Sequence, residues 1–233
     1  MTRVSLTQDL TLNGASVIAE PSGALYWPAR ETLIVADLHL EKGSSFARRG
    51  QLLPPYDSRT TLSRLADALR ARQPKRLICL GDSFHDADAA ERLGAEERET
   101  IRRLAAAVGS WIWIAGNHDP APPADLGGAV VTDHLIDGPL VFRHEALAGP
   151  AAGEISGHFH PKAAVTQRGR RIAARCFVED GRRAILPSFG AYTGGLNVLD
   201  PAISRHYADG FRVHLLGPRK VYSFPRSRLL RAG

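Results

Sequence analysis

Cysteine and long apolar stretches are both scarce in this 233-residue sequence, and each scarcity excludes a class of protein. The two cysteines, Cys79 and Cys176, lie in separate apolar stretches without a CxxC partner, which excludes a structural zinc finger and predicts two buried thiols. No apolar run approaches the roughly 20 residues that span a bilayer. The N-terminal segment MTRVSLTQDLTLNG has no apolar core of signal-peptide length. We therefore expect a soluble cytoplasmic protein without a membrane partner.

The overall composition is that of an ordinary globular protein with a basic charge balance. Hydrophobic residues make up 44% and charged residues 23%, and the chain is long enough to form one domain with a sizeable core. The formal net charge of +6 favours polyanionic partners, of which nucleic acid is the commonest. The arginines are scattered along the chain, so the charge alone does not define a binding groove.

The first half of the chain alternates short apolar runs with amphipathic stretches. Apolar residues at helical spacing predict two helices, the first with Asp57 as its N-cap. Strand, helix, strand, helix, strand is the order of an α/β fold with parallel strands. The expected strands are 17–20, 24–27, 32–36, 76–80 and 111–115, and the expected helices are 57–72 and 95–108.

The second half has short strand candidates separated by turn residues, which predicts antiparallel pairing. Both halves fit an α/β single domain, a sandwich of two mixed β-sheets flanked by helices. The proline- and glycine-rich segment 120–128 is interpreted as an active-site loop. The strand candidates here are 129–132, 140–143, 163–167, 172–178 and 183–186.

Polar side chains follow four apolar runs, at the point where each predicted strand ends. Loops at the carboxyl ends of strands are where open α/β sheets place their sites. In D-x-H and H-x-H, both side chains lie on one side of an extended backbone, so both can point at one ion. The segments are Asp37-Leu38-His39 after LIVA, Gly81-Asp82 after LICL, Gly116-Asn117-His118-Asp119 after WIWIA, and Gly157-His158-Phe159-His160 after EIS.

The ordered set is more specific than any one segment. A single D-x-H or a lone GD after a strand is weak, and His158 and His160 taken alone could be surface residues. An Asn-His-Asp run after an apolar strand has no packing purpose. Carboxylate, imidazole and amide ligands together suit Mn²⁺, Fe²⁺ or Zn²⁺. Six of the nine histidines lie in or beside these segments: His39, His85, His118, His144, His158 and His160.

The order D-x-H, GD, GNHD, a lone histidine and GHxH resembles the calcineurin-like metallophosphoesterase superfamily. The longer segments ADLHLEKGSSFARRG, GDSFHD, GEISGHFHPKA and LPSFGAYTGGLNVLD resemble the bacterial ligase-associated DNA damage response endonuclease (PdeM) family. This resemblance covers about residues 34–200, the motif core of a single domain spanning 1–233, and leaves a basic tail at 217–233. It implies DNA as substrate, and association with a DNA ligase and a helicase.

The resemblance also assigns a role to each motif residue. It implies two divalent ions, Mn²⁺ in the first place, with Fe²⁺ or Zn²⁺ as alternatives. His118 would stay free of metal as a catalytic group facing the substrate, and Asp119 would orient it by a hydrogen bond. The ligands would be Asp37, His39 and His160 for the first ion, Asn117, His144 and His158 for the second, and Asp82 as the bridge between them.

Two features leave alternatives open. Many superfamily members carry an acidic residue three positions after the bridging aspartate, where this chain has His85. His85 either reaches the leaving group or substrate phosphate as a further catalytic residue, or caps a helix. The segment SFGAYTGGLNV (188–198) either brings Gly190, Gly194 and Gly195 close to the substrate or metal loops, or is a glycine-rich strand bend.

These residues predict an enzyme that hydrolyses phosphodiester bonds. Two ions neutralise the phosphate and lower the pKa of a shared water, and His118 stabilises or protonates the leaving oxygen. The first hypothesis is an endonuclease or phosphodiesterase acting on DNA in bacterial DNA repair. The alternatives are a phosphodiesterase for small substrates such as cyclic nucleotides, and a mainly binding component of a repair assembly. The candidate phosphate contacts, which could equally be solvated charges, are Arg48, Arg49, Arg143 and Lys162.

Overall fold

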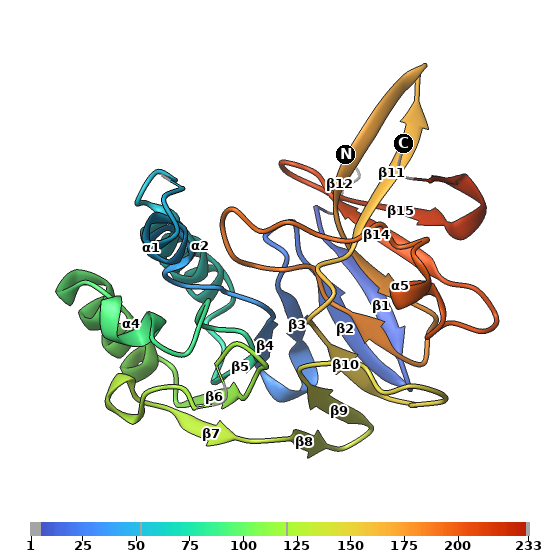
Figure 1. Ribbon diagram of the computed structural model, residues 1–233. Coiled ribbons are helices and arrows are strands. Elements are labelled where there is room, and N and C mark those ends of the chain that lie inside the picture. The colour runs from blue at the N-terminus through green and yellow to red at the C-terminus, as the bar shows by residue number, and fades with distance from the viewer. Residues whose placement is uncertain (1–5, 52, 120, 232–233) are drawn as a thin grey trace, which may run out of the picture.

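Two β-sheets packed face to face form the centre of the structure (Figure 1). The computed structural model describes residues 6–51, 53–119 and 121–231. Helices cover the outer face of the first sheet, and one short helix packs on the second sheet. The predicted α/β sandwich of two mixed sheets flanked by helices is confirmed.

The first sheet has seven strands in the described part of the chain, ordered as in the sequence. Strands β1 to β4 pair antiparallel, and β4 to β7 pair parallel. The parallel pairs bring the carboxyl ends of β4, β5 and β6 to one edge, as expected from the order of elements. The strands are β1 Gln8–Leu12, β2 Ala15–Ala19, β3 Leu25–Trp27, β4 Thr32–Val35, β5 Arg76–Leu80, β6 Ser110–Ile114 and β7 Ala129–Val131.

The second sheet runs in the order β15-β14-β12-β13-β10-β9-β8, and β11 joins it by pairing with β12 and β16. The prediction of antiparallel pairing is only partly right, because β10 lies parallel to both β9 and β13. The β11–β12 hairpin projects beyond the sandwich (Figure 1). The strands are β8 His134–Asp137, β9 Leu140–Arg143, β10 Glu154–Ser156, β11 Lys162–Gln167, β12 Arg170–Glu179, β13 Ala184–Ile185, β14 Arg212–Leu216, β15 Val221–Pro225 and β16 Leu229–Leu230.

Alternating side chains on the buried strands build two separate cores. In β4, Leu33 and Val35 pack under the helices, and Ile34 between them faces the second sheet. Successive side chains of a strand point to opposite faces of the sheet, and both faces of β4 are buried, so the two sets of side chains enter different cores. The helices are α1 Lys42–Arg48, α2 Asp57–Arg72, α3 Ala89–Arg92, α4 Ala95–Ala107 and α5 Pro201–Ser204, with 3-10 turns η1 Pro28–Arg30, η2 Ala124–Leu126 and η3 Arg226–Arg228.

Helix α2 spans the predicted residues, but Asp57 is its first helical residue and Tyr56 is the N-cap. The buried Asp57 carboxylate accepts a hydrogen bond from the Gly43 amide at 3.1 Å instead. Gly43 lies in the first turn of α1, so this bond ties α1 to α2. The expectation of a capping role is therefore wrong, and Asp57 joins two helices.

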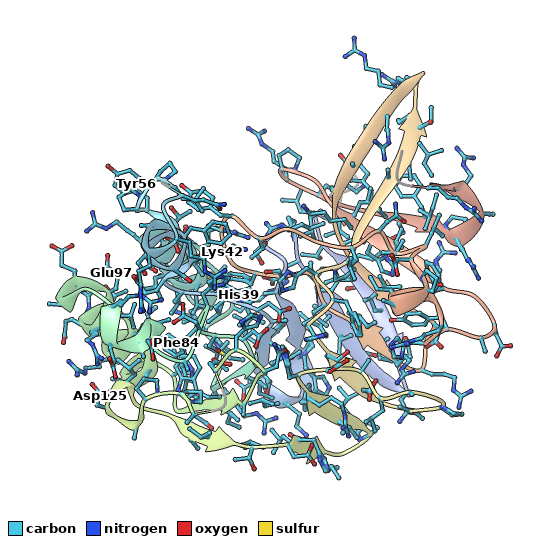
Figure 2. All side chains as sticks on the ribbon, viewed as in Figure 1. His39, Lys42, Tyr56, Phe84, Glu97 and Asp125 are labelled. Atoms are coloured by element: carbon cyan, nitrogen blue, oxygen red, sulfur yellow. The ribbon has the colours of Figure 1, made fainter. Side chains whose placement is uncertain are left out.

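The loop after β6 starts at the functional site, but its later residues lie away from the site. Of its predicted span 120–128, Pro120 lies outside the described residues. Asp125 accepts hydrogen bonds from Arg98 and Arg102 of α4, each at 2.7 Å, on the helical side of the molecule (Figure 2). Leu126 is fully buried under the same helix. The interpretation as an active-site loop is wrong for this far part, which packs on α4.

Both cysteines are buried and unpaired, as predicted. Burial raises the pKa of the Cys176 thiol far above its usual value, so the group is inert at neutral pH. Among the described residues, no helix combines the length and the apolar character needed to cross a membrane.

Candidate metal centre

Left-handed backbone turns aim the ligand side chains at the carboxyl-end edge of the sheets. Non-glycine residues rarely adopt positive φ, and such residues cluster at functional sites. The expected extended backbone at D-x-H and H-x-H is therefore wrong. The five residues with positive φ here are Asp37 (54°), His39 (45°), Asp82 (45°), His158 (69°) and His160 (47°).

Asp37, His39 and His160 form a first group, with ligand atoms within 4.8 Å of one another. The Nε2 atoms of His39 and His160 lie 3.0 Å apart, and His160 Nε2 lies 3.7 Å from an Asp37 carboxylate oxygen. Burial and the neighbouring His160 lower the pKa of His39 to about 2. A neutral imidazole with a free lone pair is the form that binds a metal ion.

Asp82, His144 and His158 form a second group with the same spacing. Asn117 Oδ1 lies 2.8 Å from His144 Nε2, and His158 Nδ1 lies 3.0 Å from that same nitrogen. His144 Nδ1 donates to the Leu80 carbonyl at 2.9 Å, since a carbonyl can only accept. Once His144 gives up its other proton to a bound cation, this bond leaves the Nε2 lone pair facing the group.

The Asp82 carboxylate lies between the two groups. Its Oδ2 atom is 3.4 Å from His144 Nε2 and 4.0 Å from His39 Nε2. Burial opposes its ionisation, but bonding to His144 and to the His118 amide outweighs burial and lowers the pKa of Asp82 to about 2. Asp82 belongs to the second group, and its ionised carboxylate also lies near His39 of the first, so a bridging role stays a prediction.

The donor set fits two divalent cations. Imidazole ring nitrogens approach each other to 3.0 Å in both groups, which requires a proton or a cation between them. Each group also includes a carboxylate, and nitrogen with oxygen ligands suits first-row divalent metals. The two H-x-H histidines divide between the groups, His160 in the first and His158 in the second.

His118 lies beside both groups and belongs to neither. Its side chain is 44% exposed, and its Nε2 is 3.9 Å from the Asp82 carboxylate. Its ring stands edge-on to the His39 ring at 5.5 Å and stacks on the His85 ring at 5.7 Å. An accessible imidazole next to the ligand groups is well placed to reach a substrate.

His85 packs into the site and does not cap a helix. Burial and the charge of Lys42 lower the pKa of His85 to about 4, so its ring is neutral at neutral pH. The next residue, Asp86, forms an ion pair with Arg92 at 2.7 Å and is directed toward the helices. Of the two alternatives, the geometry favours the one that places His85 at the substrate side.

Asp119 does not orient His118. Its buried carboxylate accepts from the amides of Ser83 at 2.7 Å, Phe84 at 3.1 Å and Gly116 at 3.2 Å. These are its hydrogen bonds among the described residues. Burial raises the pKa of Asp119 to about 7. Asp119 therefore joins the loop after β6 to the loop after β5, and the expected catalytic bond is wrong.

Glycines of the segment 188–198 pack against the backbone of the ligand loops. A Cβ atom at Gly190 would fall well inside contact distance of the Leu38 carbonyl, and one at Gly195 would do the same at His160. The Gly190 amide donates to the Asp37 carbonyl at 3.1 Å. Close approach to the metal loops therefore explains Gly190 and Gly195, whereas a Cβ at Gly194 would meet open space.

The four basic candidates separate into two kinds. Arg48 pairs with Asp88 on the surface, and the half-buried Arg143 guanidinium lies 3.2 Å from Glu154. Arg49 and Lys162 have no ion pair among the described residues. Lys42, which was not among the four candidates, lies next to His39 near the centre of the molecule (Figure 2). The sequence could have indicated Lys42, because it lies in the ADLHLEKGSS segment, three residues after His39.

Comparison with known proteins agrees with this geometry. A family model described as calcineurin-like phosphoesterase matches residues 31–185. The chain is similar to the crystal structure of Pseudomonas putida nuclease MPE, with 30% identity and a TM-score of 0.74 over 94% of this chain and 100% of that one. It is also similar to Yfce, a phosphoesterase from E. coli, with 16% identity and a TM-score of 0.43 over 83% of this chain and 98% of that one. A search of curated proteins gave no match.

The family model covers well over half of the chain. The matched residues include the D-x-H, GNHD and GHxH segments. The ligand groups that the fold assembles come from these same segments. The chain belongs to the calcineurin-like phosphoesterase family and is a metal-dependent phosphoesterase.

Proposed function

We propose that this protein is an endonuclease that hydrolyses phosphodiester bonds of DNA in bacterial DNA repair, with two Mn²⁺ ions in its site. The observation that carries the proposal is the pair of neighbouring ligand groups, with the Asp82 carboxylate 3.4 Å from His144 and 4.0 Å from His39 and an accessible His118 beside them. The similar Pseudomonas putida protein is a nuclease, and the net charge of +6 suits a polyanion. A cytoplasmic location and association with a DNA ligase and a helicase belong to the same proposal.

The chain's own residues prepare the site for an in-line displacement. When bound, two divalent ions neutralise the phosphate charge and lower the pKa of a shared water. Asp37, His39 and His160 would hold one ion, Asn117, His144 and His158 the other, and Asp82 would contact both.

His118 supplies the proton to the leaving oxygen. Its ring is 44% exposed and its Nε2 lies 3.9 Å from the Asp82 carboxylate, beside both ligand groups, so the ring can reach the leaving oxygen. A positioned general acid typically contributes about 10²–10⁴-fold. The neutral ring of His85 stacks on His118 and holds its plane without adding a competing charge.

A small phosphodiester such as a cyclic nucleotide is the second candidate substrate. A cavity of about 360 Å³ borders Asn117 and His144, and its other walls include Arg143 and Glu145. Cavities of roughly 300–1,000 Å³ accommodate small-molecule ligands. This cavity could hold a nucleotide beside the second ligand group.

The test is a substrate panel with the metal-reconstituted protein. The chelated protein is loaded separately with Mn²⁺, Fe²⁺ or Zn²⁺. It is then incubated with linear, circular and single-stranded DNA and with cyclic nucleotides and other small diesters. We expect cleavage of DNA, including circular DNA, with the highest turnover in Mn²⁺ and a steep loss of affinity as salt rises.

His118→Ala and His134→Ala form a matched pair of histidine variants for this panel. His134 lies on β8 and pairs with the neighbouring Asp133, outside both ligand groups. His118→Ala should lose most turnover and His134→Ala should keep it. Two results would contradict the proposal. One is hydrolysis of small diesters without any cleavage of DNA, and the other is DNA cleavage that does not depend on salt concentration.

A further inference from the structure

A basic pocket, lined in part by the segment 188–198, lies next to the metal centre. It has a volume of about 450 Å³, and its walls include Arg64, Lys162, Arg175 and Tyr192. No acidic residue lines it among the described residues. Gly190 also lines the pocket, and its amide donates to Asp37 of the first ligand group. The pocket and the metal centre therefore share a wall.

The two arginines are held in place without a carboxylate partner. Arg64 donates from one Nη atom to the Ser22 carbonyl at 2.9 Å, and its guanidinium lies 4.9 Å from the Phe189 ring centroid. Arg175 donates from one Nη atom to the Ser188 carbonyl at 2.6 Å. Within the described part of the chain, neither forms an ion pair, and their other N–H groups keep free hydrogen-bonding capacity. Burial lowers the pKa of Arg175 to about 10, and the charge of Arg64 adds to this effect.

Two lysines continue the positive charge from the pocket to the ligand residues. Lys162 lines the pocket and follows His160 by two positions. Lys42 lies close enough to Lys162 for the charge of Lys162 to lower its pKa, in addition to burial and against the opposing charge of Asp57. The two pocket arginines and Lys162 form no ion pair among the described residues, and partly buried cations without counter-charges are costly unless an anion joins them.

The rim carries an exposed aromatic side chain on a strained backbone. Tyr192 is 46% exposed and has a φ of 57°, which a non-glycine residue rarely adopts. An aromatic ring beside a cluster of cations is the arrangement that binds a nucleotide through its base and its phosphate.

We propose that this pocket binds a phosphate of the DNA strand that flanks the scissile one, with Arg64, Arg175 and Lys162 as its cationic ligands and Tyr192 against the attached nucleoside. Guanidinium groups suit this task because their planar N–H pairs match phosphate oxygens. The inference rests on the proposed DNA substrate and explains it. A diester with a single phosphate cannot occupy both the metal centre and the pocket, whereas a polynucleotide can.

The experiment measures binding of a fluorescein-labelled oligodeoxynucleotide to metal-free protein by anisotropy over a range of salt. The variants are Arg64→Gln, Arg175→Gln, Lys162→Gln and Tyr192→Ala. Arg170→Gln is the matched control, because Arg170 is exposed on β12, the strand that also carries Arg175. Arg170→Gln removes one positive charge, as the pocket variants of arginine and lysine do, but at a position outside the pocket. Arg64→Lys keeps the charge and serves as a rescue variant.

We expect each charge-removing pocket variant to weaken binding by roughly 10-fold. The slope of log affinity against log salt concentration should fall by about one. Tyr192→Ala should weaken binding and leave the salt dependence unchanged, because it removes no charge. Arg64→Lys should recover part of the affinity. Equal affinity and salt dependence in Arg64→Gln, Lys162→Gln and the Arg170→Gln control would overturn the inference, even if Arg175→Gln failed to fold.

A separate measurement distinguishes this failure from failure of the proposed function. Wild-type protein loaded with Mn²⁺ is assayed on bis(4-nitrophenyl) phosphate, which has one phosphate and reports on the metal centre alone. Absence of hydrolysis there would refute the metal-dependent mechanism. Hydrolysis there, with oligonucleotide binding unaffected by the pocket variants, would refute only the pocket.

Discussion

At the scale of single residues, strain and electrostatics concentrate on the same few side chains. Asp37 and Asp82 adopt positive φ, which costs on the order of 1–3 kcal/mol for such a residue. Their carboxylates compensate by accepting backbone amides, Asp37 from His158 at 3.0 Å and Asp82 from His118 at 3.0 Å. Each aspartate thus fixes the loop that carries a neighbouring histidine.

Replacing His85 tests whether its stacked ring supports His118. His85→Ala removes the ring that lies 5.7 Å from the His118 ring, and we expect turnover to fall about 10-fold or more with metal content unchanged. His85→Phe keeps an aromatic surface and should retain more turnover than His85→Ala. Steady-state hydrolysis of a small diester and metal analysis check both variants. Equal turnover of His85→Ala and wild type would contradict this role.

The metal-free protein should lose stability as the solution becomes basic. Interaction with Asp82 and Asp37 outweighs burial and raises the pKa of His144 to about 9. The folded state therefore holds this proton above the pH at which the unfolded chain releases it, near 6.5. The resulting stability is fully present below pH 6.5 and is lost as pH rises through about 9.

The measurement is the Tm of chelated protein from pH 6 to pH 10. His144→Gln removes the titrating group, so the decline assigned to His144 should be absent in that variant. A wild-type decline that His144→Gln leaves unchanged would show that other groups cause it.

At the scale of elements, the segment 188–198 acts as a template for the ligand loops. Gly190→Ala places a methyl group against the Leu38 carbonyl, whereas Gly194→Ala places one in open space. We expect Gly190→Ala to destabilise the fold by about 1–3 kcal/mol and to weaken metal binding. Gly194→Ala should differ little from wild type. Urea unfolding and metal titration of the pair provide the comparison, and equal stability of the two variants would contradict the template role.

Regular elements with strong periodicity could be predicted from the sequence. Helix α2 and strands β5 and β9 begin and end at the predicted residues because their apolar spacing is clear. Helix α1 was not predicted, since its sequence KGSSFAR has weak helix propensity and the helix is held by the Asp57 carboxylate. The short edge strand β8 was missed for a similar reason, because pairing with β9 and not propensity defines it.

The identity of the ligand residues could also be predicted, but their geometry could not. Polar residues directly after apolar strands marked the site, and the structure brings carboxylates and histidines from these positions together in two groups. The left-handed turns at Asp37 and His39 contain non-glycine residues at positive φ, so no glycine in the sequence indicates them. The bonds of Asp119 depend on the Ser83 and Phe84 amides, which only the fold brings within reach.

At the scale of the whole molecule, the metal centre joins the two sheets. Asp37, Asp82 and Asn117 follow strands of the first sheet, and His144 and His158 follow strands of the second. Bound cations would therefore add ligand bonds between two layers that share an apolar core and a few polar contacts, such as the hydrogen bond from His144 to the Leu80 carbonyl. Ligands that bind only the folded state stabilise it by mass action.

Chelation should therefore lower the stability of the whole protein. Free metal at 1,000 times its Kd would contribute about 4 kcal/mol, and EDTA would remove this contribution. We expect a clear fall in Tm on adding EDTA to the wild type. Asp82→Ala should have a Tm that responds little to EDTA. An EDTA response in Asp82→Ala as large as that of the wild type would contradict the bridging position of Asp82.

The division of labour between Asp82 and His118 is the central claim, and metal content measured alongside turnover tests it most directly. Wild type, Asp82→Ala and His118→Ala are purified, loaded with Mn²⁺, analysed for bound metal and assayed on bis(4-nitrophenyl) phosphate. The expected result is that His118→Ala keeps two ions per chain but loses about 10²–10⁴-fold in turnover, and that Asp82→Ala loses both metal and turnover. Full metal-dependent activity in Asp82→Ala would contradict the account.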